Sequence, residues 1–120
     1  MFEDIFTRFY QGNHAIKVIG VWGKDGLVLE KKFFSDSFDL NGHIDLDFSG
    51  AELADIITKL DRTKTAAGSY FLKLVYRNNA LMIYSLTRDY FLMILTDNNI
   101  LEGKLKFYLD LYRDQLISLL

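Results

Sequence analysis

Two short stretches of the sequence contain residue types that could carry chemistry, and the first is GVWGKDGLVLE at 20–30. Its regularly spaced glycines and its Gly-Lys pair suggest a loop that cradles phosphate. A P-loop, however, needs a glycine five residues before its Gly-Lys pair and a Ser or Thr after it. The chain has Val18 and Asp25 at those positions. A strand-like run follows Gly26, where a dinucleotide-binding motif requires a helix, so the pattern favours a hairpin turn over a nucleotide site.

The second stretch is the acidic segment SDSFDLNGHIDLD at 35–47. Aligning Gly42 with the central glycine of a calcium-binding loop brings several residues to suitable positions: Asp39, Asn41, Ile44 and Asp45. The first ligand position is then Ser37, and the last, which must supply a bidentate carboxylate, is Phe48. A solvated loop that is open to contact with a partner is the better interpretation.

The same segment contains the pattern His-x-Asp-x-Asp at 43–47, which could form one corner of a metal site. The only other histidine is His14, and the chain has no cysteine, so the supply of ligands is thin. Carboxylates also occur in pairs here (Asp36 with Asp39, Asp45 with Asp47), but nothing nearby would shift their pKa values. We therefore expect no catalytic residue, no metal, no cofactor and no enzymatic activity.

Composition narrows the class of protein further. The chain has 120 residues, of which 50% are hydrophobic, so one domain spanning 1–120 with a substantial core is expected. The net charge of −2 argues against nucleic-acid binding, which needs a basic face. No apolar run is long enough to insert into a membrane. The acidic, amphipathic N-terminus is not a secretory signal, and we expect a cytoplasmic protein.

The N-terminal third predicts a helix followed by a hairpin. Apolar residues recur at helical spacing over 2–11, and Gly12-Asn13 follows as a stop signal. Two strand-like runs at 15–22 and 27–34 flank the turn residues of 23–26, which is the signature of a hairpin. Gly20 in mid-strand indicates a bulge or a close approach of another element, and Trp22 is a residue that could reach a partner.

A second helix is predicted over 49–65. Ser49 is a good N-cap, and Glu52 three residues later completes a capping box. The apolar stripe of this helix faces the sheet, which leaves one charged stripe turned outward: Glu52, Asp55, Lys59 and Arg62. Such a stripe is either a solvated face with weak charge pairs or a docking surface.

The C-terminal half predicts three antiparallel strands and a last helix. The strands are 70–77, 80–87 and 90–96, joined by turns at Asn78-Asn79 and Arg88-Asp89, and the last two are apolar enough to be covered on both faces. Asp97-Asn98-Asn99 is expected to cap a helix through 120. Its apolar residues form two faces, so we expect it to pack against more than one neighbour: Leu101, Leu105, Tyr108, Tyr112 and Leu119 on one face, Phe107 and Leu111 on the other.

The element order α-β-β-α-β-β-β-α indicates an α/β (α+β) sandwich with a largely antiparallel sheet. At this point the sequence resembles the roadblock/dynein light chain domain family over about residues 2–116. The stretches that carry the resemblance are VIGVWGKDGLVLE, SGAELADIITKL and YFLMILTDNNILEGKLKFYL. The resemblance implies a profilin-like or longin-like sheet of order 2-1-5-4-3. It also places the middle helix on one face of that sheet and the two terminal helices on the other.

The resemblance further implies a homodimer, or a heterodimer with another roadblock protein, in which the third strand pairs with its counterpart. The edge residues would be Tyr70, Leu72, Leu74, Val75 and Tyr76. A long hydrophobic edge left unpaired would promote aggregation, which agrees with this expectation.

In function, the resemblance implies an adaptor that binds a Ras-like small GTPase through the charged stripe of the middle helix, and in one bacterial branch activates its GTP hydrolysis. The alternative is a structural scaffold subunit without GTPase contact. Two departures leave the branch open: the long connection 35–47, and few small residues in the middle helix, namely Ala51, Ala54, Ala66 and Ala67. We do not expect Arg62 to act as an arginine finger.

Overall fold

The computed structural model describes residues 1–34, 71–76, 79–97 and 100–120. Within them lie seven elements: α1 (Phe2–Gly12), β1 (Ile16–Gly23), β2 (Val28–Phe33), β3 (Phe71–Tyr76), β4 (Asn79–Ser85), β5 (Tyr90–Asp97) and α3 (Glu102–Ser118). The strands form one antiparallel sheet in the order β2-β1-β5-β4-β3. The predicted α+β class with an antiparallel sheet is therefore confirmed. The helix predicted over 49–65 lies outside the described residues.

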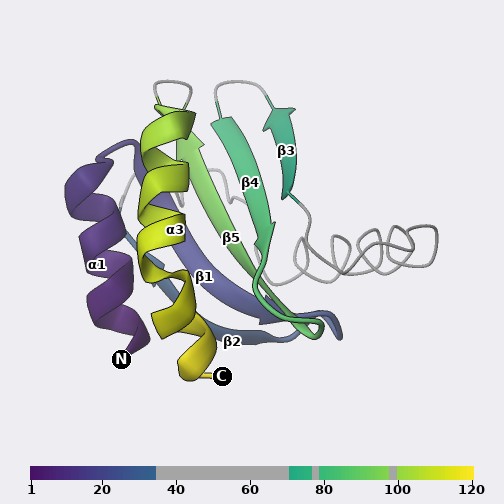
Figure 1. Cartoon of the computed structure of the whole chain (residues 1–120). Helices are drawn as coiled ribbons and strands as arrows, with labels where there is room; N and C mark the ends of the chain where they lie inside the picture. The colour runs from purple at the N-terminus through teal and green to yellow at the C-terminus, as the bar shows by residue number, and fades with distance from the viewer. Residues whose placement is uncertain (35–70, 77–78, 98–99) are drawn as a thin grey trace.

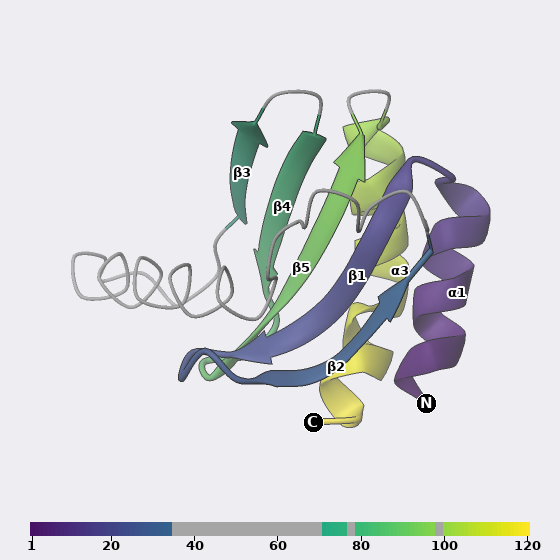
Figure 2. The same cartoon turned by 180° about the vertical axis from the view of Figure 1, so that it is seen from behind.

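Both described helices cover the same face of the sheet and lie side by side (Figures 1 and 2). The buried side of α1 consists of Ile5, Phe6 and Phe9, at the helical spacing seen in the sequence. Aromatic rings join the two helices, because Phe9 lies 6.1 Å from Tyr108 and 6.0 Å from Tyr112 between ring centroids. The terminal elements of the chain are thus held together on one face of the sheet.

The sheet is buried on both faces at its centre. Side chains from β1, β4 and β5 pack with α1 and α3 on one face, among them Ile19, Met82 and Ile94. A second cluster lies on the other face and consists of Val18, Trp22, Ile83, Phe91 and Met93. The expectation that β4 and β5 are covered on both sides is confirmed.

The first hairpin is built as its glycines predicted. The N–H of Gly26 donates to the carbonyl of Gly23 at 3.0 Å, and Gly26 has a φ of 87°, which is favourable for glycine and strained for other residues. The Asp25 carboxylate accepts a hydrogen bond from the Leu27 N–H at 3.0 Å, which fixes the reversal. This is a three-residue hairpin loop that ends in a left-handed glycine.

Both predicted turns of the C-terminal meander were wrong in position. Asn79 belongs to β4 and pairs with Tyr76, so the connection from β3 is 77–78 and not Asn78-Asn79. The β4–β5 connection spans 86–89 and not Arg88-Asp89 alone, because the N–H groups of Leu86 and Thr87 both donate to the carbonyl of Tyr90. The turn residues in the sequence indicated that the chain reverses at each place, but not which two residues form the last pair of the flanking strands.

The predicted start of the last helix was also wrong. Asp97 is the final residue of β5, where its N–H donates to the carbonyl of Ala15 at 3.1 Å. The helix begins at Glu102 with Leu101 as its N-cap residue, and Leu101 makes no side-chain cap hydrogen bond. Pairing with Asn79 of β4 extended the strand past the threonine that the sequence suggested as its end. The helix ends at Ser118 rather than at 120.

The faces of α3 differ from the expected pair of packed faces. Leu105, Leu109 and Leu116 are buried against the sheet. Leu101, predicted to share an apolar face with Leu105, is 66% exposed, because it stands before the first turn of the helix. Phe107 and Leu111 are 61% and 53% exposed, so no described residue covers the second apolar face.

Candidate protein interface

Strand β3 lies at one edge of the sheet, with β4 as its only described neighbour (Figure 1). The register runs from Phe71 opposite Tyr84 to Tyr76 opposite Asn79, without a bulge. In an antiparallel ladder, every second residue of an edge strand directs its N–H and C=O away from the sheet. A regular strand of six residues therefore presents about three outward pairs of backbone groups to another strand.

The side chains described on β3 are Lys73 and Val75, and both are exposed. Lys73 donates to the carboxylate of Glu102 at the start of α3, an ion pair that ties the edge strand to the helix layer. The Val75 side chain, in contrast, is 66% exposed. An apolar, β-branched side chain on an outer strand is compatible with a further strand laid against it.

The other predicted edge residues are placed only by the backbone. Leu72 and Leu74 lie in β3 opposite Ile83 and Leu81, and Tyr76 is its last residue. Tyr70 lies outside the described residues. So do all four charged candidates for GTPase docking, Glu52, Asp55, Lys59 and Arg62, and the acidic stretch at 35–47 with its calcium and metal patterns.

The glycine-rich stretch holds no phosphate site in its described geometry. Gly20 lies within β1, where an added Cβ would stand 2.6 Å from the Trp22 ring and 2.8 Å from the Glu30 carbonyl oxygen. Close approach inside the hairpin therefore accounts for this glycine. Trp22 is fully buried, so the prediction that it reaches a partner was wrong. Its Nε1 has no hydrogen-bond partner within the described part of the chain.

The described titratable groups do not converge on a reactive centre. They include no cluster of three His, Asp or Glu side chains that could hold a metal. The pKa of Glu3 is lowered by a hydrogen bond from the Lys32 ammonium, 2.8 Å away, which links α1 to β2. Burial raises the pKa of Tyr84 to about 12. Both shifts follow from packing of the fold and not from arrangement around a substrate.

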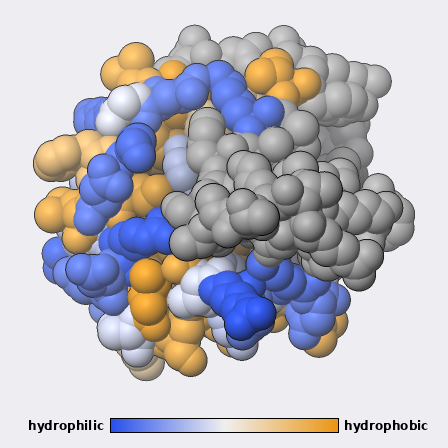
Figure 3. All heavy atoms as spheres, turned by 45° about the vertical axis from the view of Figure 1, so that its right-hand side comes forward, coloured by the Kyte–Doolittle hydropathy of each residue, from blue (hydrophilic) through white to orange (hydrophobic). Residues whose placement is uncertain are grey.

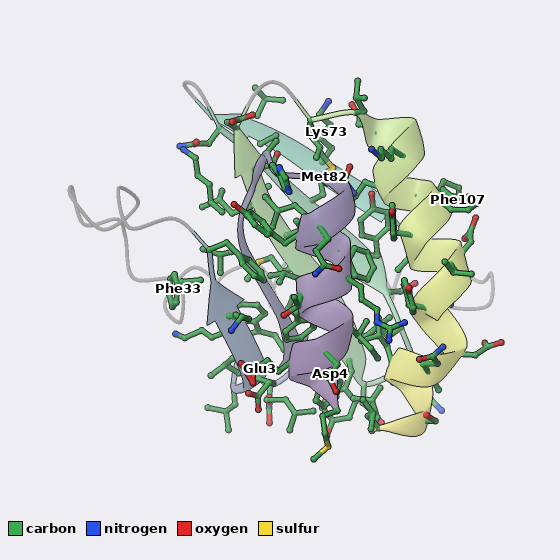
Figure 4. All side chains as sticks on the ribbon, turned by 90° about the vertical axis from the view of Figure 1, so that its left-hand side faces the viewer. Glu3, Asp4, Phe33, Lys73, Met82 and Phe107 are labelled. Carbon is green, nitrogen blue, oxygen red and sulfur yellow. The ribbon has the colours of Figure 1, made fainter. Side chains whose placement is uncertain are left out.

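Several large apolar side chains of the described residues are exposed. Figure 3 shows hydrophobic groups interspersed among hydrophilic ones on the face that it presents. Phe33 projects from β2 away from the helices, and Phe107 points outward from α3 (Figure 4). The helices of the described residues include none that is both long enough and apolar enough to cross a membrane. Sequence reasoning missed the exposure of Phe107 and Leu111, since helical periodicity alone does not say which apolar stripe meets the sheet.

Comparisons with known proteins agree with this architecture. A scan against protein-family models finds no match, and no curated protein matches the sequence. Solved structures do match. The gliding protein MglB of Thermus thermophilus gives a TM-score of 0.77 at 14% identity, with 97% of this chain and 85% of that one covered. MglC of Myxococcus xanthus gives 0.65 at 18% identity, covering 99% and 98%.

A Roadblock/LC7 domain from Streptomyces avermitilis gives a TM-score of 0.71 at 10% identity, with 92% of this chain and 89% of that one covered. Structural similarity at identities this low establishes the fold but not the activity. The resemblance seen in the sequence is thus confirmed at the level of structure: the chain has the fold of the roadblock domains.

Proposed function

We propose that the chain is a non-enzymatic, dimeric adaptor that binds and regulates a Ras-like small GTPase. The observation that carries this proposal is the roadblock fold with β3 as a regular edge strand. The likeness to MglB, a gliding protein, supports a regulatory role of the kind that the sequence resemblance implies. In the proposed molecule, the middle helix covers the face of the sheet opposite α1 and α3, and 1–120 is a single domain.

The proposed dimer pairs β3 with β3 of a second copy, or of another roadblock protein, in antiparallel orientation. About three outward residues on each strand would then exchange hydrogen bonds, each contributing about 0.5–1.5 kcal/mol net. Val75 would pack across the junction, while the Lys73–Glu102 ion pair holds the strand against α3. This pairing removes the open edge and places the two middle helices on one side of a continuous sheet.

The proposed docking surface is the charged stripe of the middle helices: Glu52, Asp55, Lys59 and Arg62. Both signs of charge occur on it, which suits recognition of a mixed polar surface on a GTPase. Regulation then follows from a difference in affinity, because an adaptor shifts a partner's switch only by binding one nucleotide state more tightly. Faster GTP hydrolysis would be one consequence of holding the switch regions in their reactive arrangement.

The test is binding of the purified protein to the Ras-like GTPases of its source organism, each loaded with GDP or a non-hydrolysable GTP analogue. Lys59→Glu should weaken binding, whereas Lys106→Glu makes the same charge change at an exposed position on α3 and should not. Equal binding in both nucleotide states, or none, would contradict regulation. A dimer that binds no GTPase would identify the alternative, a purely structural scaffold subunit.

A further inference from the structure

Four exposed side chains form a stripe along the outer side of α3: Lys104, Phe107, Leu111 and Asp114. We call this set the outer stripe. Its 3-4-3 spacing keeps the four residues on one side of a helix and is the spacing of helix–helix seams. At 1.5 Å per residue, the stripe is about 15 Å long. The buried stripe of the same helix, with Leu105, Leu109 and Leu116, faces the sheet instead.

The centre of the outer stripe is apolar and open. Phe107 is 61% exposed and Leu111 is 53% exposed, and neither packs against the core. The one ring contact described for Phe107 is edge-on to Tyr108, with centroids 5.8 Å apart. Its ring points outward from α3 (Figure 4). Two large apolar side chains one turn apart on the solvent side of a helix indicate an interaction surface.

The chemistry of the outer stripe is self-complementary. It runs from a cation through two apolar residues to an anion. Positions 104 and 114 lie equally far from 109, and so do 107 and 111. A two-fold axis at the level of 109 therefore places Lys104 opposite the partner subunit's Asp114 and Phe107 opposite the partner subunit's Leu111. An isologous interface requires this kind of match between a surface and its own copy.

We propose that α3 binds a second copy of this chain in antiparallel orientation through the outer stripe. Within the described part of the chain, neither Lys104 nor Asp114 has an ion-pair partner, so both charges are available across the axis. One helix seam buries less than the roughly 800 Å² per partner of a standard stable interface. The association is therefore weak and depends on concentration. Combined with pairing at β3, it joins dimers into larger assemblies.

The test is sedimentation velocity over a concentration series of the purified chain and its charge variants. Lys104→Glu and Asp114→Lys each place like charges across the axis and should weaken self-association about tenfold. The exchange K104E/D114K restores opposite charges and should restore the affinity to within about twofold of the original. Lys106→Glu lies off the outer stripe and should change nothing. Repeating the series in a Val75→Lys background isolates this contact from pairing at β3.

Several results would overturn the proposal. One is an exchange variant that remains as weak as the two single variants, since only a two-fold arrangement predicts rescue. Another is self-association that does not respond to Phe107→Ser with Leu111→Ser, because both side chains are exposed and their loss leaves the fold intact. A chain that shows no association by α3 at any concentration, while β3 still forms a dimer, would mean that the outer stripe serves a different partner.

Discussion

Replacing Gly20 with alanine should destabilise the protein, although the change adds only one methyl group. The new Cβ would stand 2.6 Å from the Trp22 ring, 2.8 Å from the Glu30 carbonyl oxygen and 2.8 Å from the Lys31 Cβ. Favourable carbon contacts lie at about 3.5–4.0 Å. The fully buried Trp22 ring and a backbone carbonyl cannot turn aside, so strands β1 and β2 must separate locally.

The size of the effect follows from two opposing contributions. Overpacking of a tight interior costs about 1–3 kcal/mol. Alanine recovers about 0.5–1 kcal/mol of backbone entropy relative to glycine. The clash is the larger of the two, and the free energy of unfolding should fall by about 1–2 kcal/mol. For a domain of this size, the melting temperature should drop by about 3–8 °C.

The assay is thermal and urea unfolding followed by circular dichroism, with Gly103→Ala as the matched control. An added Cβ at Gly103 meets nothing within 4 Å, so the control should be unchanged or slightly more stable. Gly20→Val adds further atoms at the same point and should cost more than alanine. An alanine variant as stable as the original, or a control that loses as much, would refute the packing of the hairpin described here.

Two further predictions concern the sheet edge and alkaline pH. Val75→Lys should convert the proposed β3 dimer to a monomer without loss of fold, because Val75 is exposed and a charge would replace the apolar contact proposed at that position; light scattering that still reports a dimer would place the interface elsewhere. Burial raises the pKa of Tyr84 to about 12, against about 10 in the unfolded chain. Its contribution to stability is therefore complete below about pH 10 and lost as the pH rises towards 12, and Tyr84→Phe should flatten that decline in urea midpoints.

Local sequence signals were sufficient to predict the structure where residues close together in the sequence determine the backbone geometry. Gly23, Asp25 and Gly26 fixed the first hairpin because the turn needs a left-handed glycine and a side-chain acceptor next to it. The amphipathic spacing of 2–11 likewise predicted α1 and its buried face. In both places, backbone preference and hydrophobic pattern favour the same structure.

Tertiary contacts decided the features that the sequence could not predict. Asp97 has the side chain of a helix cap, yet pairing with Asn79 of β4 and the hydrogen bond from its N–H to the Ala15 carbonyl kept it in the strand. Trp22 was predicted as a residue that could reach a partner, but it belongs to a strand that is buried on both faces, and its ring packs in the second core cluster. Phe107 looked like a core residue by type, and only the packing of α3 on the sheet showed that it is exposed.

The candidate interface was predictable in part. The hydrophobic run at 70–77 indicated a strand, and the resemblance implied that it stands at the edge of the sheet, where β3 lies. The sequence did not predict that Val75 is exposed or that Lys73 forms an ion pair with Glu102. Both features depend on how the edge strand packs beside α3, and these two segments are distant in the sequence. The GTPase-docking role of Lys59 and its neighbours remains a prediction from the resemblance.

The most direct test of the central claim is the affinity of the purified protein for a Ras-like GTPase of its source organism in the two nucleotide states. Titration calorimetry would give both dissociation constants under the same conditions. An adaptor that regulates the switch should bind one state about 5–150 times more tightly than the other, the range typical of coupled sites. Equal affinity for the GDP and GTP-analogue forms, or no binding to either, would contradict the proposed function.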